Sequence, residues 1–77
     1  MDNEVLSIIK SVVDTAVFTG FNNESEKMLT DMSNKLHQYY GEPIKVNLSF
    51  TAATMAVTVD ILRGDIRESI DITQWLI

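Results

Sequence analysis

The 77-residue sequence contains no cysteine and a single histidine, His37, so two common ways of stabilising a small domain are missing. No disulfide can form, and structural zinc sites need several cysteine and histidine ligands together. A domain of this size buries only about 60% of the surface that its unfolded chain exposes, which leaves a small margin of stability. We therefore expect self-association or partner binding to contribute the rest, and we expect no metal and no other cofactor.

Basic side chains are also scarce, because six lysines and arginines are scattered among eleven acidic residues and the net charge is -5. Nucleic-acid binding draws most of its affinity from clustered basic residues, so we expect no nucleic-acid partner. No apolar run approaches the roughly 18 residues of a membrane-spanning helix. Asp2 and Glu4 lie where a signal peptide has basic residues. We expect a cytoplasmic protein with no membrane partner.

Apolar residues are plentiful, since leucine, isoleucine, valine and phenylalanine make up 24 of the 77 residues. That composition is typical of a folded chain and not of a disordered one. The length allows a single domain, residues 1–77. Its first half has the periodicity of helices and its second half that of strands.

The first expected helix covers residues 3–19, with Asp2 or Asn3 as N-cap and Gly20 as its stop. Most of its positions are apolar: Val5, Leu6, Ile8, Ile9, Val12, Val13, Ala16, Val17 and Phe18. A helix that covers one face of a sheet needs an apolar stripe of about 100° or somewhat more. This stripe is much wider, so we expect the helix to be buried on two sides.

The second expected helix covers residues 24–40. Asn23 and Glu26 have the spacing of a capping box, and Gly41 with Pro43 ends the helix. Its apolar residues form one stripe of ordinary width at Met28, Leu29, Met32, Leu36, Tyr39 and Tyr40. The two helices are expected to form a helical hairpin.

After Pro43 the apolar residues alternate, which predicts strands over residues 44–50, 55–62 and 66–77. A four-residue turn at residues 51–54 places Leu48 opposite Val57, so that every inward pair is apolar. The predicted fold is α+β: a helical hairpin followed by a three-stranded antiparallel β-meander, with the helices packed on one face of the sheet.

The second turn of the meander offers two registers. A loop of residues 64 and 65 places Val59 opposite Ile70 and moves Glu68 toward the turn, next to Ile61. A loop one residue earlier pairs Asp60 with Arg67 but sets Glu68 in mid-sheet, facing the core. We prefer the first register because a carboxylate that faces a core is costly.

The end of the third strand leaves two apolar side chains uncovered. Strand phase directs Trp75 and Ile77 toward the face that the helices do not cover, and tryptophan is enriched at binding hot spots. The alternative is that the last residues curl back and close the core. Pairing of two third strands across a twofold axis would shelter both side chains. The predicted interface, with itself or another protein, comprises Trp75, Ile77, Thr73, Val13, Val17 and Phe18.

No catalytic motif is present. The serines lack a nucleophile-elbow context, His37 lies off the apolar stripe of its helix, and the three glycines are too far apart to form a phosphate loop. The sequence predicts a non-enzymatic, acidic protein-binding module, an inhibitor, adaptor or regulator such as phages and mobile elements encode, acting as a homodimer without a small-molecule substrate. The alternatives are a structural subunit of a larger assembly and a nucleic-acid-mimicking inhibitor.

Overall fold

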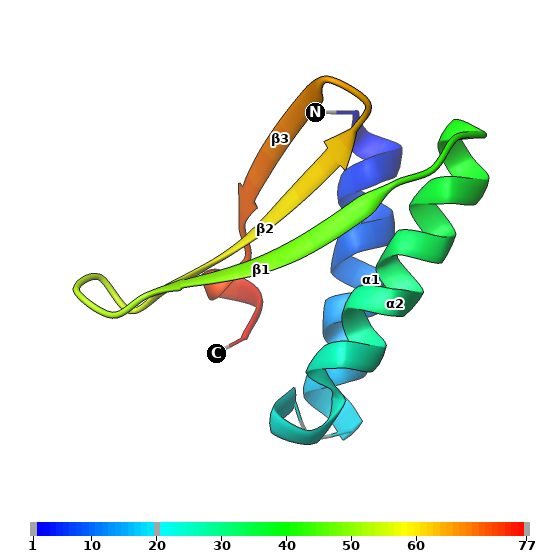
Figure 1. Cartoon of the computed structure of the whole chain (residues 1–77). Helices are drawn as coiled ribbons and strands as arrows, with labels where there is room; N and C mark the ends of the chain where they lie inside the picture. The colour runs from blue at the N-terminus through cyan, green and yellow to red at the C-terminus, as the bar shows by residue number, and fades with distance from the viewer. Residues whose placement is uncertain (1, 20, 77) are drawn as a thin grey trace.

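The computed structural model describes residues 2–19 and 21–76, with side chains placed for residues 2–17 and 26–76. Two helices, α1 (Asn3–Thr19) and α2 (Phe21–Tyr40), precede three strands, β1 (Lys45–Thr51), β2 (Ala56–Arg63) and β3 (Ile66–Asp71), and a short 3-10 helix, η1 (Thr73–Trp75). The strands form one antiparallel sheet in the order β1-β2-β3. Figure 1 shows the two helices side by side next to this sheet. The predicted α+β fold is confirmed.

Helix α1 begins as the sequence predicts. The Asp2 carboxylate accepts a hydrogen bond of 2.9 Å from the backbone N–H of Glu4, which satisfies one of the free donors of the first turn. Helix α1 contacts α2 and η1. Its buried side chains form one stripe of about 100° at 3.6 residues per turn: Val5, Ile9, Val12, Val13 and Ala16. Beside this stripe Leu6 and Ile8 are half-buried and Val17 is 40% exposed. The buried stripe is therefore narrower than the apolar surface of the helix, and burial on a second side stays a prediction.

Helix α2 begins earlier than predicted. It starts at Phe21, three residues before the expected start at residue 24, so Asn23 lies inside the helix and is not its N-cap. The physical reason is that only position 20, outside the described residues, separates the two helices. The chain therefore has no non-helical segment in which Asn23 could serve as an N-cap. At its other end, His37 Nδ1 donates a hydrogen bond of 2.7 Å to the carbonyl oxygen of Glu42 and closes the turn toward β1.

The register between β2 and β3 is the one preferred from the sequence. Val59 lies opposite Ile70 and Ile61 opposite Glu68, and the connecting loop is the two residues 64 and 65. Gly64 adopts a φ of 60°, a value in the left-handed region that favours glycine. Glu68 is half-buried at this end of the sheet.

The register between β1 and β2 differs by two residues from the prediction. Leu48 lies opposite Val59 and not opposite Val57, because the turn occupies residues 52–55 and not residues 51–54. Met55 adopts a positive φ of 53° in this turn, which is unusual for a residue other than glycine. A shift of two residues keeps every side chain on its predicted face, so the predicted apolar face is retained although its partners change.

The third strand ends at Asp71 and does not continue to residue 77 as predicted. The Asp71 carboxylate accepts a hydrogen bond of 2.8 Å from the N–H of Thr73, and the Thr73 hydroxyl in turn accepts one of 2.8 Å from the N–H of Val57. These side-chain bonds replace the strand ladder and turn the chain into η1. The alternative from the sequence, a terminus that curls back onto the core, is the one observed for the described residues.

The core lies between the helices and the inner face of the sheet. Its buried apolar residues come from both helices, from the residue before β1, from β2 and from the residue after β3: Val5, Ile9, Val12, Val13, Ala16, Met28, Met32, Leu36, Ile44, Val59, Ile61 and Ile72. Burial of this kind is worth roughly 25 cal/mol per Å² of apolar surface. The inner face of the sheet thus packs against the helices, and the opposite face carries exposed polar side chains such as Asn47, Ser49 and Ser69.

Candidate protein-binding surface

The residues predicted to form an interface do not share one surface. Val13 is fully buried in the core of the chain, and Thr73 forms the turn after β3. Trp75 is half-buried and packs against the core, so its predicted outward direction is wrong; η1 rotates it away from strand phase. Val17 is 40% exposed. The side chain of Phe18, and Ile77, lie outside the described residues.

The edge of the sheet at β1 is not part of the interface predicted from the sequence. Strand β1 lies at one end of the strand order, and in the part of the chain that the structure describes it pairs with β2 alone. Its seven residues include one charged side chain, Lys45, at its first position. Natural sheets protect such edges with charges, prolines or bulges, because an unprotected edge pairs with other strands. We call this unprotected strand edge the β1 edge.

The edge at β3 differs in composition. Among its six residues, Arg67, Glu68 and Asp71 are charged, and the chain leaves the sheet immediately afterwards to form η1. Charges of both signs on a short strand discourage pairing with another chain. The two edges of this sheet are therefore unequal, and β1 is the one open to a partner strand.

A shallow groove of about 320 Å³ runs between the β1 edge and α2. Its lining is uncharged except for Lys45: Leu29, Thr30, Ser33, Asn34, Ile44, Lys45 and Val46. Ser33 Oγ donates a hydrogen bond of 2.6 Å to the carbonyl oxygen of Ile44 and fixes α2 against the start of β1. The groove therefore lies between α2 and the side of β1 that, among the described residues, pairs with no other strand.

The far end of the β1–β2 hairpin exposes apolar side chains. Figure 1 shows this end of the hairpin extending away from both helices. Phe50 is 60% exposed and Met55 67% exposed, because the inner face of the sheet continues past the helices that cover it. Phe50 has the same phase as Leu48 and Val46, so the three side chains form one apolar row along β1.

The open face of the sheet is polar, and its centre is Asp60 on β2. This residue is only 7% exposed. Its carboxylate accepts three hydrogen bonds, from Ser69 Oγ at 2.6 Å, from Arg67 Nη2 at 3.1 Å and from Ser49 Oγ at 3.4 Å. The Ser69 hydroxyl, with help from the Arg67 guanidinium, holds the pKa of the Asp60 carboxyl below its ordinary value. Cross-strand spacing could have indicated this network, since Ser69 lies opposite Asp60.

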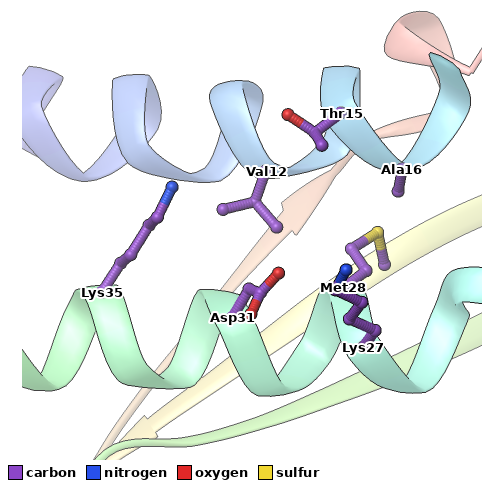
Figure 2. Close-up of a pocket in the computed structure, with 7 residues that line it drawn as sticks. All are labelled: Val12, Thr15, Ala16, Lys27, Met28, Asp31 and Lys35. Atoms are coloured by element: carbon purple, nitrogen blue, oxygen red, sulfur yellow. The ribbon is translucent and has the colours of Figure 1, made fainter. Parts of the chain in front are cut away.

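A second, smaller pocket lies between the helices and has a volume of about 80 Å³. Figure 2 shows Lys35 and Asp31 extending from α2 toward α1 at this pocket. Small-molecule sites usually enclose roughly 300–1,000 Å³, so the pocket gives no indication of a substrate. Among the described residues, no group of three or more His, Cys, Asp or Glu side chains could hold a metal ion.

Two further polar contacts connect distant parts of the chain. The Tyr39 hydroxyl on α2 donates a hydrogen bond to the Asp2 carboxylate before α1. This bond raises the pKa of Tyr39 to about 12 and lowers the pKa of Asp2. The guanidinium of Arg63 lies 4.3 Å from the centre of the Tyr40 ring, in a cation–π contact between β2 and the end of α2.

Comparisons with protein-family models, with curated proteins and with solved structures find no match. Across residues 2–19 and 21–76, neither helix has the length and apolar character needed to span a membrane. The surfaces described above are therefore the evidence on function.

Proposed function

We propose that this protein is a non-enzymatic protein-binding module, acting in the cytoplasm as an adaptor, inhibitor or regulator, and that it binds through the β1 edge and the adjoining groove. The observation that supports this proposal best is the β1 edge itself, seven residues long with one charge at its end. No cofactor, nucleic acid, membrane or small-molecule substrate takes part in the proposed activity.

Strand addition fits the chemistry of this surface. An extended segment that pairs with a sheet edge gains backbone hydrogen bonds along its length, and alternate side chains supply specificity. On the inner side, the incoming side chains would meet Val46 and Leu48, which are half-buried, and the wall formed by Leu29 and Ser33 of α2. On the outer side they would meet the exposed Asn47 and Ser49.

The test compares three forms of the tagged protein in affinity capture from the native host, read by quantitative mass spectrometry. The Asn47→Lys/Ser49→Lys variant places two lysines on the exposed side of the β1 edge, where edge strands commonly carry them. The matched control, Ser11→Lys/Gln38→Lys, adds the same charge at exposed helical positions. The edge variant is expected to lose the captured partner and the control to retain it.

Unchanged capture by the edge variant, with both variants folded by circular dichroism, would show that the β1 edge is not the binding surface. Loss of capture by both variants would show instead that net charge governs binding. In either case the proposal of strand addition would be withdrawn.

A further inference from the structure

We infer that the strand occupying the β1 edge is the β1 strand of a second copy of this chain, paired antiparallel about a twofold axis midway between Leu48 and its copy, which we call the axis through Leu48. The inference rests on the proposed function, because it names the occupant of the same edge: the partner captured from the native host would be the untagged copy of this chain. It makes a six-stranded sheet with all four helices on one face. Another protein's strand is the competing occupant, and the experiments below separate the two.

Symmetry restricts how two copies of one edge can pair. Residues directly opposite in an antiparallel pair have side chains on the same face of the sheet. A twofold axis perpendicular to the sheet must therefore set one residue opposite its own copy. An axis that set a residue opposite its sequence neighbour would place inner-face side chains opposite outer-face ones. Strand β1 has seven residues and its middle residue is Leu48. The axis through Leu48 pairs the whole strand with its copy.

The pairs that this register creates are compatible on both faces. On the inner face Leu48 lies opposite its own copy, and Val46 lies opposite Phe50 of the second copy. Phe50, which is 60% exposed in the single chain, gains an apolar neighbour. On the outer face Asn47 lies opposite Ser49, and Lys45 opposite Thr51. No charged side chain is placed opposite another.

Shifted registers pair fewer residues of the strand with the second copy. An axis through Asn47 places Thr51 opposite Pro43, which precedes the strand and has no N–H to donate. An axis through Ser49 places Lys45 opposite Ala53, which belongs to the turn. Both shifts lose pairing at one end of each strand, and only the register centred on Leu48 pairs all seven residues.

The β3 edge does not allow an equivalent arrangement. Its six residues have their midpoint between Glu68 and Ser69, so no permitted axis pairs the whole strand. An axis through Glu68 sets two carboxylates opposite each other, which is unfavourable. An axis through Ser69 places Glu68 opposite the half-buried Ile70. The β3 dimer expected from the sequence is therefore the weaker of the two alternatives.

The charge distribution also favours the β1 edge for contact between two acidic chains. The part of α2 that lines the β1 groove, Leu29, Thr30, Ser33 and Asn34, is uncharged. The charged residues Lys27, Asp31 and Lys35 instead line the pocket between the helices, where Figure 2 shows Asp31 and Lys35 extending toward α1. A second copy approaching the β1 edge thus meets few like charges although each chain carries a net charge of -5.

The absence of cysteine makes the register directly measurable. Directly opposite residues of an antiparallel pair have Cα atoms about 4.5–5.5 Å apart, within the range of about 4.4–6.8 Å that a disulfide spans. Single-cysteine variants Leu48→Cys, Asn47→Cys, Ser49→Cys and Ser69→Cys are oxidised separately and resolved by non-reducing electrophoresis. Only Leu48→Cys is expected to form a covalent dimer efficiently, because residues 47 and 49 are each offset from their own copies by two positions.

Sedimentation equilibrium of the unmodified chain, at concentrations up to about 1 mM, is expected to show a monomer–dimer equilibrium. The Asn47→Lys/Ser49→Lys variant is expected to weaken the dimer about tenfold or more, because lysines then lie opposite lysines at two symmetry-related places. The Ser11→Lys/Gln38→Lys control is expected to dimerise as the unmodified chain does.

Each other outcome either overturns the inference or separates it from the proposed function. Cross-linking through Ser69→Cys would place the dimer at β3, and cross-linking through Asn47→Cys or Ser49→Cys would show a shifted register. A chain that stays monomeric to about 1 mM has no such dimer. If that monomer still captures a host protein through the β1 edge, the proposed function stands and the occupant is another protein. If a β1 dimer forms while capture ignores the edge variants, the dimer stands and the proposed function fails.

Discussion

Substituting Trp75 distinguishes a core residue from an interface residue. In the structure Trp75 is half-buried against the core cluster. A tryptophan side chain buries roughly 150–250 Å², worth about 4–6 kcal/mol at roughly 25 cal/mol per Å². The actual loss is smaller for three reasons: part of the ring is exposed, alanine keeps one methyl group, and a compact unfolded state already buries part of the side chain. We expect Trp75→Ala to lower the free energy of unfolding by about 2–3 kcal/mol.

That loss is a large share of the stability of so small a domain. At about 0.05–0.15 kcal/mol per residue, a chain of this length has a free energy of unfolding of roughly 4–12 kcal/mol. The melting temperature should fall by about 10–20 °C. Urea and thermal unfolding are followed by far-ultraviolet circular dichroism, because the variant lacks the only tryptophan in the sequence.

Two control variants test whether the loss of stability comes from the buried ring of Trp75. Trp75→Phe keeps an aromatic ring in the same place and should lose less stability, and Val17→Ala, at a position 40% exposed, should change stability little. The opposite result is that Trp75→Ala unfolds at the urea concentration of the unmodified chain while its self-association weakens. That result would show that Trp75 faces a partner, as strand phase alone predicts.

Three further predictions concern the polar network, the helix ends and the hairpin. Asp60→Asn should lower stability at neutral pH and reduce the acid sensitivity of the fold. The reason is that the pKa of Asp60 is lower in the folded chain than its ordinary value of 3.8, so its contribution to stability is present above pH 3.8 and is lost as the pH falls through the folded-state pKa. If the free energy of unfolding fell equally steeply with acid pH in the variant and the unmodified chain, this prediction would be wrong. Tyr39→Phe should remove a phenolate absorbance transition near pH 12, and Asp2→Asn should move that transition toward 10. Since the raised pKa of Tyr39 gives stability that is lost as pH rises through about 12, the Phe variant should also unfold less steeply in alkali. Phe50→Ser should change the free energy of unfolding by only about 0.5 kcal/mol while weakening self-association in sedimentation, and a large loss of stability would place Phe50 in the core.

The sheet could be predicted from the sequence where two constraints could be combined. For β2 and β3, Gly64 restricts the turn to two loops and the cost of a carboxylate facing the core selects one of them, and Val59 does lie opposite Ile70. For β1 and β2 the alternation determines the face of each residue but not the partner. Registers that differ by two residues have identical faces.

The details that could not be predicted depend on side-chain contacts between distant residues. The first sheet turn includes Met55 at a positive φ, and methionine carries no turn signal. The third strand ends because the Thr73 hydroxyl meets the N–H of Val57, a contact that exists only after β2 is in place. The meander itself predicts residues 44–50 as an edge strand, and the structure confirms this order. The end of β3 at Asp71 then shows that the other edge is the shorter and more charged one.

The position of η1 has a consequence for how this chain folds. Neighbouring strands are consecutive in the sequence, and so are the two helices, so most of the fold closes through short loops at low entropic cost. The contact between η1 and α1 is different, because it joins the two ends of the chain. Contacts between distant segments slow folding, so η1 should dock after the helical hairpin and the meander have formed. Because Trp75 lies on η1, its fluorescence should record this last step, while circular dichroism records the earlier ones.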